Sequence, residues 1–216
     1  MIPNKIKGIL FDFDGVIAKT MEDNFNAWKK AMQDYGIEIK DENYYPLEGM
    51  ALKEIAKKFC RKFNLDKSLI DEIVKKKEKY YLKFHHFEFY PGVEEFIDIL
   101  KFKKILVGLV TAALFDRLKK TLPDNFIKKF DTIVSGERTE RGKPFPDPYL
   151  KGLCNLKLKD DECIVIENSP LGIKSAKRAN LYCIAICSTL NTSYLNEADE
   201  IINEFKDLRK ILMKFF

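Results

Sequence analysis

The chain has 216 residues, of which 46% are hydrophobic and 33% charged, and its formal net charge is +5. This length suits one large globular domain, or a core domain with a modest insertion. The composition speaks against a membrane protein, because no apolar run approaches the roughly 20 residues that a spanning helix needs.

The start of the chain and its cysteines both predict a cytoplasmic protein. Residues 1–5 lead directly into an apolar stretch and lack the three-part design of a signal peptide. The five cysteines include no Cys-x-x-Cys pair and lie partly in apolar runs, as free thiols do. We expect no membrane partner and no nucleic-acid partner, because the densest basic run, 75–79, follows helical periodicity without a binding motif. The oligomeric state stays open, with a monomer favoured.

The first predicted element is a buried strand at residues 6–11, followed by two carboxylates, Asp12 and Asp14. Gly15 comes directly after them, so the chain must bend here. Paired aspartates at the carboxyl end of a strand lower the stability of the fold unless a cation or hydrogen-bond donors compensate their charge. Open parallel sheets bind their ligands at that end of the strands. The motif therefore predicts a metal and phosphate site, although taken alone an ordinary Asp-Gly turn explains it equally well.

Helical patterns dominate the next 70 or so residues. The expected helices are 20–35, 52–63 and 68–84. Ser68 is the expected N-cap of the last helix, and residues 41–46 read as a polar turn. Because no convincing strand occurs in this stretch, we expect an inserted helical domain at residues 18–90.

Strands and helices alternate regularly after residue 90. The expected strands are 104–110, 131–135, 162–166 and 182–187, and the expected helices are 93–101, 114–121, 147–153 and 171–179. Nearly continuous apolar strands that alternate with helices are typical of a parallel sheet covered on both faces. We therefore expect an α/β fold in which residues 1–17 and 91–216 form a Rossmann-like, doubly wound parallel sheet.

Polar residues follow the ends of the predicted strands. They are Asp12 and Asp14 after the first strand, Thr111 after the second, Glu167 and Asn168 after a later one, and Lys143 in a loop. In a doubly wound sheet these points converge on one edge. Such a set suits Mg²⁺ and a phosphoryl group, because Mg²⁺ prefers oxygen ligands and usually keeps several waters. Taken singly, Thr111 would more readily cap the following helix, and Lys143 would be one of many surface lysines.

Together these motifs resemble the haloacid dehalogenase superfamily, in the branch with a small helical cap inserted after the first motif. That branch holds β-phosphoglucomutase and phosphoglycolate phosphatase. The four motifs are Phe11-Asp12-Phe13-Asp14-Gly15-Val16, Val110-Thr111-Ala112, Gly142-Lys143-Pro144 and Val165-Ile166-Glu167-Asn168. The resemblance covers essentially the whole chain and implies the same core and cap.

The resemblance also implies a role for each motif residue. Asp12 would be the nucleophile that forms an aspartyl-phosphate, and Asp14 the general acid and base. Thr111, the amide of Ala112 and Lys143 would bind the phosphoryl oxygens. The implied Mg²⁺ ligands are Asp12, Asp14 (through its backbone carbonyl), Glu167 and Asn168.

Two positions depart from the pattern of these relatives. Many relatives carry an acidic residue where Asn168 stands, so this site has one negative charge fewer. In β-phosphoglucomutases an arginine of the cap grips the phosphate that is not transferred, whereas Leu52 stands at that position here. Lys53 follows it and is a candidate phosphate ligand, although only as a point charge. Loss of the arginine favours hydrolysis over isomerisation.

The sequence thus predicts a Mg²⁺-dependent phosphatase for a small phosphorylated metabolite, such as a sugar phosphate. The alternative is an isomerase similar to β-phosphoglucomutase. A non-catalytic binding or scaffold protein is disfavoured, because it would not need Asp14, Lys143 and the acid–amide pair together.

Overall fold

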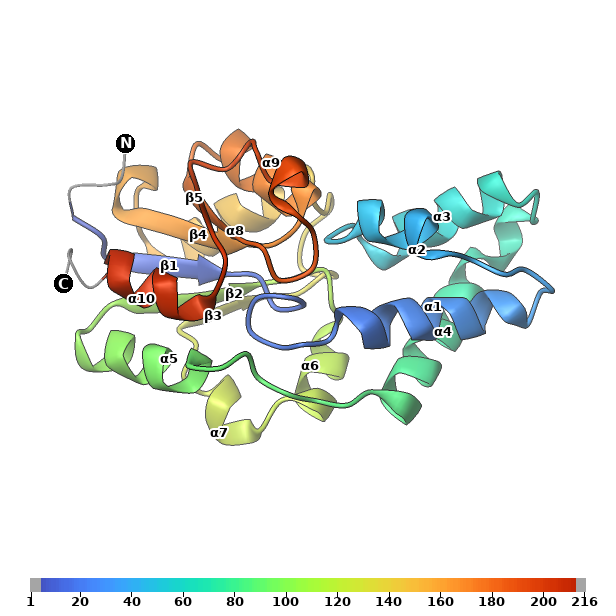
Figure 1. Cartoon of the computed structure of the whole chain (residues 1–216), viewed down its shortest axis with the longest axis horizontal. Coiled ribbons are helices and arrows are strands. Elements are labelled where there is room, and N and C mark those ends of the chain that lie inside the picture. The colour runs from blue at the N-terminus through green and yellow to red at the C-terminus, as the bar shows by residue number, and fades with distance from the viewer. Residues whose placement is uncertain (1–4, 213–216) are drawn as a thin grey trace.

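A parallel sheet forms the centre of the larger part of the computed structural model, which describes residues 5–212 (Figure 1). Its six strands lie in the order β3-β2-β1-β4-β5-β6 and all pair in parallel. The strands are β1 (Gly8–Phe11), β2 (Leu106–Val110), β3 (Thr132–Val134), β4 (Cys163–Glu167), β5 (Tyr182–Ile186) and β6 (Glu200–Ile202). This confirms the predicted α/β fold. The strand order reverses at β1, and ligands of such sheets bind outside the carboxyl ends of the strands there.

Helices cover both faces of the sheet, because successive strand residues point to opposite sides. On one face lie α5 (Val93–Phe102), α6 (Phe115–Thr121), α7 (Asp124–Ile127) and α10 (Phe205–Leu212), and on the other α8 (Asp147–Leu156) and α9 (Pro170–Arg178) (Figure 1). Ile9 and Phe11 belong to the buried cluster of the first face, and Leu10 to that of the second. Burial on both sides explains the continuous apolar sequence of β1. The 3₁₀ turns η3 (Asp160–Glu162) and η4 (Thr192–Tyr194) lie in the connecting segments.

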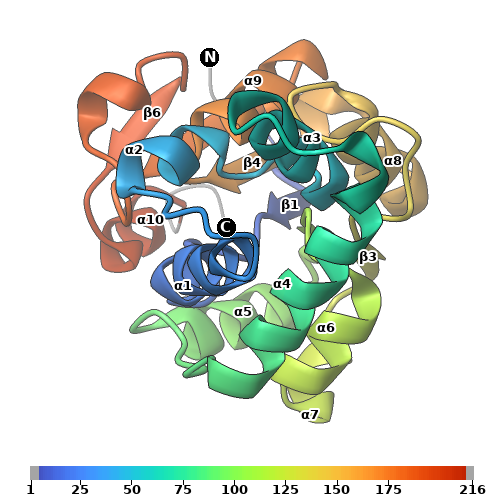
Figure 2. The same ribbon diagram turned by 90° about the vertical axis from the view of Figure 1, so that its right-hand side faces the viewer.

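The second part of the molecule, here called the cap, is helical and lies beyond the carboxyl end of β1 (Figure 1). It contains α1 (Met21–Gln33), α2 (Asp41–Tyr44), α3 (Leu52–Lys62) and α4 (Ile70–Phe84), with the 3₁₀ turns η1 (Tyr45–Leu47) and η2 (Lys67–Leu69). Helices α1 and α4 lie side by side, and α3 packs against α4 (Figure 2). Trp28 is fully buried among these helices, edge-on to Phe59, so the cap has an apolar core of its own.

Two neighbouring segments connect the cap to the sheet. Ala18 forms an antiparallel bridge with Phe89, and the amide of Tyr90 donates to the carbonyl of Ile17 at 3.1 Å. These contacts lie beside the boundaries expected from the sequence, after residues 17 and 90. The division into a core of residues 1–17 and 91–216 and a cap of residues 18–90 stays a prediction, and residues 1–4 and 213–216 lie outside the described part.

The structure differs from the predicted elements mainly where segments are short or polar. Residues expected as a turn form α2 and part of η1, because the side chain of Asn43 accepts from the amide of Lys40 at 3.0 Å and stabilises a helical start. The prediction of Ser68 as an N-cap is wrong, since Asp66 accepts from the amide of Ser68 at 2.8 Å and begins η2 instead. The sequence pattern does not predict helices α7 and α10 or strand β6, whose three residues are too few to show alternation. Between residues 5 and 212, no helix is both long and apolar enough to cross a membrane.

Candidate active site

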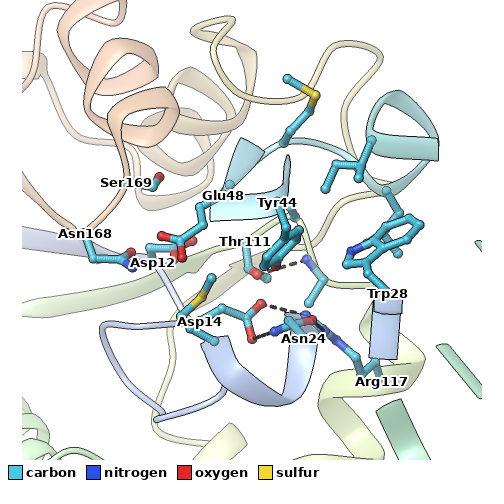
Figure 3. Close-up of a pocket in the computed structure, with 17 residues that line it drawn as sticks. Asp12, Asp14, Asn24, Trp28, Tyr44, Glu48, Thr111, Arg117, Asn168 and Ser169 are labelled. Carbon is cyan, nitrogen blue, oxygen red and sulfur yellow. Dashed lines mark hydrogen bonds and ion pairs between the residues drawn. The ribbon is translucent and has the colours of Figure 1, made fainter. Parts of the chain in front are cut away.

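Side chains from several strand ends and from the cap line one cavity between the two parts of the molecule (Figure 3). Asp12 and Asp14 follow β1, Thr111 follows β2 and Asn168 follows β4, so one edge of the sheet brings them together as predicted. The cap adds Glu48 from the loop before α3. The cavity has a volume of only about 30 Å³, which leaves room for one or a few water molecules.

Lys143 joins Asp12 to Glu167 beneath this cavity. Its ammonium donates to Oδ1 of Asp12 at 2.6 Å and also to Oε1 of Glu167, and all three side chains are at most 5% exposed. Burial raises the pKa of Asp12 to about 7, although the Lys143 ammonium opposes this. Burial disfavours the charged form of Lys143, but its two carboxylate partners outweigh this and hold its pKa above the usual range. The lysine therefore stays a cation beside the predicted nucleophile.

Glu167 is held from several directions and has little capacity for a further ligand. The hydroxyl of Tyr149 donates to its Oε1 at 2.8 Å, and the amides of Asn168 and Ser169 donate to its Oε2 at 2.9 and 3.1 Å. A Cβ atom at Gly172 would lie 1.7 Å from Oε1, so only glycine leaves room for the carboxylate. Glu167 thus fixes Lys143 and the start of the loop that carries Asn168, while its place in the predicted ligand set stays a prediction.

Thr111 lies at the end of β2, 4% exposed, and its hydroxyl accepts from the amide of Ala113 at 3.0 Å. The following helix, α6, begins at Phe115 with Leu114 as its N-cap residue, so Thr111 does not cap it. Both Thr111 and Ala112 line the cavity beside Asp12. Their position fits the predicted binding of phosphoryl oxygens.

Asp14 is surrounded by hydrogen-bond donors that the sequence motifs do not predict. Thr20 and Asn24, one helical turn apart at the start of the cap, donate to its Oδ1 at 2.5 and 3.0 Å. Arg117, from α6, donates to its Oδ2 at 2.6 Å and to Oδ1 of Asn24 at 2.7 Å (Figure 3). The guanidinium is 2% exposed and lies 4.5 Å from the ring centre of Tyr81. The i,i+4 spacing of Thr20 and Asn24 just after the motif indicates in the sequence that both face Asp14. No sequence pattern indicates that Arg117 contacts Asp14.

A buried ion pair of the cap extends this network. The ammonium of Lys77, which is fully buried, donates to Oδ1 of Asn24 at 2.7 Å and to Glu78 at 2.9 Å. Burial lowers the pKa of Lys77 to about 8, with Glu78 opposing and Arg117 adding to the effect. Asn24 therefore accepts from one cation of the cap and one of the core.

The predicted phosphate ligand Lys53 does not lie with the other site residues. It pairs with Asp71 at 2.8 Å, has a side chain that is 66% exposed, and lines a neighbouring groove of about 590 Å³ between α3 and the Lys143 loop. Leu52, by contrast, lines the cavity itself, at the position where relatives place an arginine.

The oxygen atoms that remain available around Asp12 are suitable ligands for a hard divalent cation. Oδ1 of Asn168 is buried and has no hydrogen-bond partner, because the amide nitrogen of the same side chain donates to Thr189 at 2.9 Å. Among residues 5–212, no three His, Cys, Asp or Glu side chains gather as a ready-made metal cage. Mg²⁺ does not need one, since it commonly uses one or two carboxylates and keeps several waters. The residues present therefore fit the expected ion.

Known proteins share both this sequence pattern and this fold. The sequence model of the haloacid dehalogenase-like hydrolases matches residues 9–186. The probable pseudouridine-5'-phosphatase of Saccharomyces cerevisiae is 31% identical over 202 residues, which cover 84% of this chain and 83% of the yeast protein. The phosphorylated carbohydrates phosphatase of Thermotoga maritima is 26% identical over 231 residues, with 94% of this chain and 100% of that protein covered. A solved structure of β-phosphoglucomutase from Clostridium difficile matches with a TM-score of 0.85 at 24% identity, over 97% of each chain, which supports the shared fold.

Proposed function

The chain belongs to the haloacid dehalogenase-like hydrolases, and on this basis we propose that it is a Mg²⁺-dependent phosphatase for a small phosphorylated metabolite, such as a sugar phosphate. One observation carries the proposal. Asp12 and Asp14 line the same cavity in different surroundings, the first against the Lys143 ammonium and the second in a network of donors. Two carboxylates with separate partners suit separate roles in one reaction.

In the proposed first step, a carboxylate oxygen of Asp12 attacks the substrate phosphorus. A bond forms between this oxygen and phosphorus, the bond from phosphorus to the leaving oxygen breaks, and Asp14 gives its proton to that oxygen. In the second step a water attacks the phosphorus, Asp14 takes a proton from this water, and the bond to Asp12 breaks to release inorganic phosphate. Thr111, the amide of Ala112 and Lys143 hold the phosphoryl oxygens throughout.

The surroundings of Asp14 hold its carboxylate in one orientation. Thr20 and Asn24 donate to one of its oxygens and Arg117 donates to the other. For the first step Asp14 must carry a proton and reach the leaving oxygen. Substrate binding therefore has to loosen these contacts.

The cation would add positive charge beside the transferred phosphoryl group. Asp12, the backbone carbonyl of Asp14 and Oδ1 of Asn168 are its proposed ligands. Glu167 positions these ligands by accepting hydrogen bonds from Lys143 and from the amide of Asn168.

The size of the cavity requires movement of the cap. A space of about 30 Å³ is roughly a tenth of the smallest ordinary ligand pocket, so no phosphorylated metabolite fits into the cavity beside Asp12 and Asp14 as the cap lies here. The two connecting segments that meet near Ala18 and Phe89 are the proposed hinge. A cytoplasmic location and a monomeric state stay predictions.

Release of phosphate from a panel of substrates tests the proposal. The panel contains phosphorylated carbohydrates, for which hexose phosphates serve as examples, and pseudouridine 5'-phosphate, the two substrate types in the names of the phosphatases above, each with and without Mg²⁺. Asp12→Asn is expected to lower the rate at least about 10³-fold, whereas Asp41→Asn, an exposed aspartate of the cap, leaves it unchanged. Equal rates for wild type and Asp12→Asn would refute the assignment. Conversion of β-glucose 1-phosphate to glucose 6-phosphate without phosphate release would favour the mutase alternative, which Leu52 disfavours.

A further inference from the structure

Two buried oxygen atoms beside Asp12 have no hydrogen-bond partner. One is Oδ1 of Asn168 at the sheet edge, and the other is Oε1 of Glu48 in the cap loop. Both residues line the cavity and both are 1% exposed, and the labelled side chains of Glu48, Asp12 and Asn168 lie close together in Figure 3. A buried acceptor without a donor is costly, so a pair of them around one carboxylate requires an explanation.

Thr189, in the loop after β5, fixes the direction of both side chains. Its hydroxyl donates to Oε2 of Glu48 at 3.2 Å and accepts from the amide nitrogen of Asn168 at 2.9 Å. Because the single hydroxyl proton is used for Glu48, Asn168 must turn its nitrogen to Thr189 and its oxygen away from it. The same threonine therefore leaves one free oxygen on each neighbour.

The charges of the site are also unbalanced. In their ionised forms the four carboxylates of Asp12, Asp14, Glu48 and Glu167 face only two cations, Lys143 and Arg117, an excess of two negative charges. Burial opposes this excess while no cation is bound, since it raises the pKa of Asp12 to about 7 and that of Glu48 to about 8. Both cations are already engaged with residues other than Glu48, and no ion pair of Glu48 occurs in the described part of the chain. A buried charge without a partner is strongly unfavourable, and a divalent cation would neutralise this excess.

We propose that Glu48 is a ligand of the divalent cation, supplied by the cap in addition to the ligands on the sheet. The inference rests on the proposed function in taking Asp12 and Asn168 as ligands from the core. Together with the backbone carbonyl of Asp14, the carboxylates of Asp12 and Glu48, the amide oxygen of Asn168 and bound waters form a ligand set typical of Mg²⁺. The cation then connects the cap to the sheet.

Because Glu48 lies in the cap loop that contacts the core, binding of the cation also affects closure of the cap. Its neighbours Gly49 and Met50 lie close to the core: a Cβ at Gly49 would lie 2.7 Å from Oγ of Ser169, and Met50 forms a β-bridge with Lys143. Without the cation, the ionised forms of Glu48, Asp12 and Glu167 would repel one another across this contact. The substrate-free cap therefore closes when the cation binds and opens when it is removed.

Binding of Mn²⁺ to the substrate-free protein, followed by electron paramagnetic resonance, tests the role of Glu48 separately from activity. Wild type is expected to bind one Mn²⁺, and Glu48→Gln, which keeps an acceptor for Thr189, to bind it about 10- to 100-fold more weakly. The control Glu54→Gln removes an exposed cap carboxylate paired with Lys57 and should bind as wild type does. The melting temperature should rise with Mn²⁺ much more in wild type than in Glu48→Gln, and small-angle scattering should show expansion of wild type on addition of a chelator.

The outcomes separate this inference from the proposed function. Equal Mn²⁺ affinity of wild type and Glu48→Gln would overturn the role of Glu48 and leave the phosphatase proposal standing, with a bridging water as the partner of the two oxygens. Absence of Mn²⁺ binding to folded wild type would overturn both. If Glu48→Gln were less stable than wild type in the absence of any cation, the proposed charge excess would also be wrong.

Discussion

Nη2 of Arg117 lies 2.6 Å from Oδ2 of Asp14 at the boundary between cap and sheet, where the arginine is buried and the aspartate partly buried. The two residues are 103 positions apart in the chain. Through its other nitrogen Arg117 also reaches Asn24 of the cap. The arginine therefore couples the orientation of the proposed acid and base to the position of the cap, and we regard it as a positioning residue.

Replacement of Arg117 is expected to lower turnover more than substrate affinity. Arg117→Met leaves Asp14 free to adopt other orientations, so kcat should fall about 10- to 100-fold while KM changes by less than about threefold. It also leaves buried charge unpaired, which costs about 3–5 kcal/mol of unfolding free energy. Arg117→Lys keeps the charge and one donor, so its losses should be smaller. Steady-state kinetics and urea unfolding measure both effects, and an unchanged kcat in Arg117→Met would contradict the positioning role.

Lys143 is expected to stabilise the fold as well as the reaction. Lys143→Met leaves Asp12 and Glu167 buried without their shared cation, so the unfolding free energy should fall by about 3–5 kcal/mol. Adding Glu167→Gln removes one of the two stranded charges, so the double variant should lose less than the sum of the single losses, by about 1–3 kcal/mol.

A surface ion pair provides the control for the Lys143 variants. Lys174 and Glu197 lie 3.2 Å apart with side chains 45% and 55% exposed, so Lys174→Met should change the unfolding free energy by less than about 1 kcal/mol. Urea unfolding without added cation gives all four values. Simple additivity of the Lys143 and Glu167 variants would show that the buried contacts do not act as a unit.

The positions of Asp12, Thr111 and Asn168 could be predicted because each follows a strand end, where local sequence decides its place. Buried parallel strands such as β1 have continuous apolar sequences, and their order brings Asp12, Thr111 and Asn168 to one edge. Glu48 and Arg117 carried no such signal, because a charged residue in a loop or short helix is usually exposed. Whether it turns inward depends on how the cap packs on the sheet.

The same physical reason explains the position of Lys53. Beside Leu52 in the sequence, it was the natural substitute for the missing arginine, but one residue along a helix turns a side chain by about 100°. Leu52 therefore faces the cavity while Lys53 faces Asp71 and solvent. If Lys53 binds substrate, it must do so from the neighbouring groove.

The buried lysine of the cap predicts a pH dependence of stability. Burial lowers the pKa of Lys77 to about 8 in the folded protein, from the usual 10.5, so between these values the unfolded chain binds more protons. The stability of wild type relative to Lys77→Met should therefore rise as pH increases through this range, on the order of 1–3 kcal/mol in total. Lys75→Met removes an exposed lysine of the same helix and should show no such slope. Urea unfolding at several pH values from 7.5 to 10 measures the difference, and parallel curves for the two variants would contradict a strongly lowered pKa.

Alanine variants of two cap glycines distinguish an effect on closure of the cap from an effect on the free energy of unfolding. Gly49 has a φ of +79°, and a Cβ there would lie 2.7 Å from Oγ of Ser169 across the boundary between cap and sheet. Gly36 has a φ of +72°, and a Cβ there would meet nothing within 4 Å. Alanine at either position adopts an unfavourable left-handed conformation that costs about 1–2 kcal/mol. Only Gly49→Ala also pushes the cap loop away from the core.

We therefore expect Gly49→Ala to lower kcat/KM by about tenfold or more, because the reacting groups no longer meet in their closed positions. Gly36→Ala should keep kcat/KM near the wild-type value while losing a similar amount of unfolding free energy. Phosphatase kinetics and urea unfolding on both variants give the comparison. If the two variants lost activity equally, the loss would follow stability alone, and the contact of Gly49 with the core would have no part in closing the site.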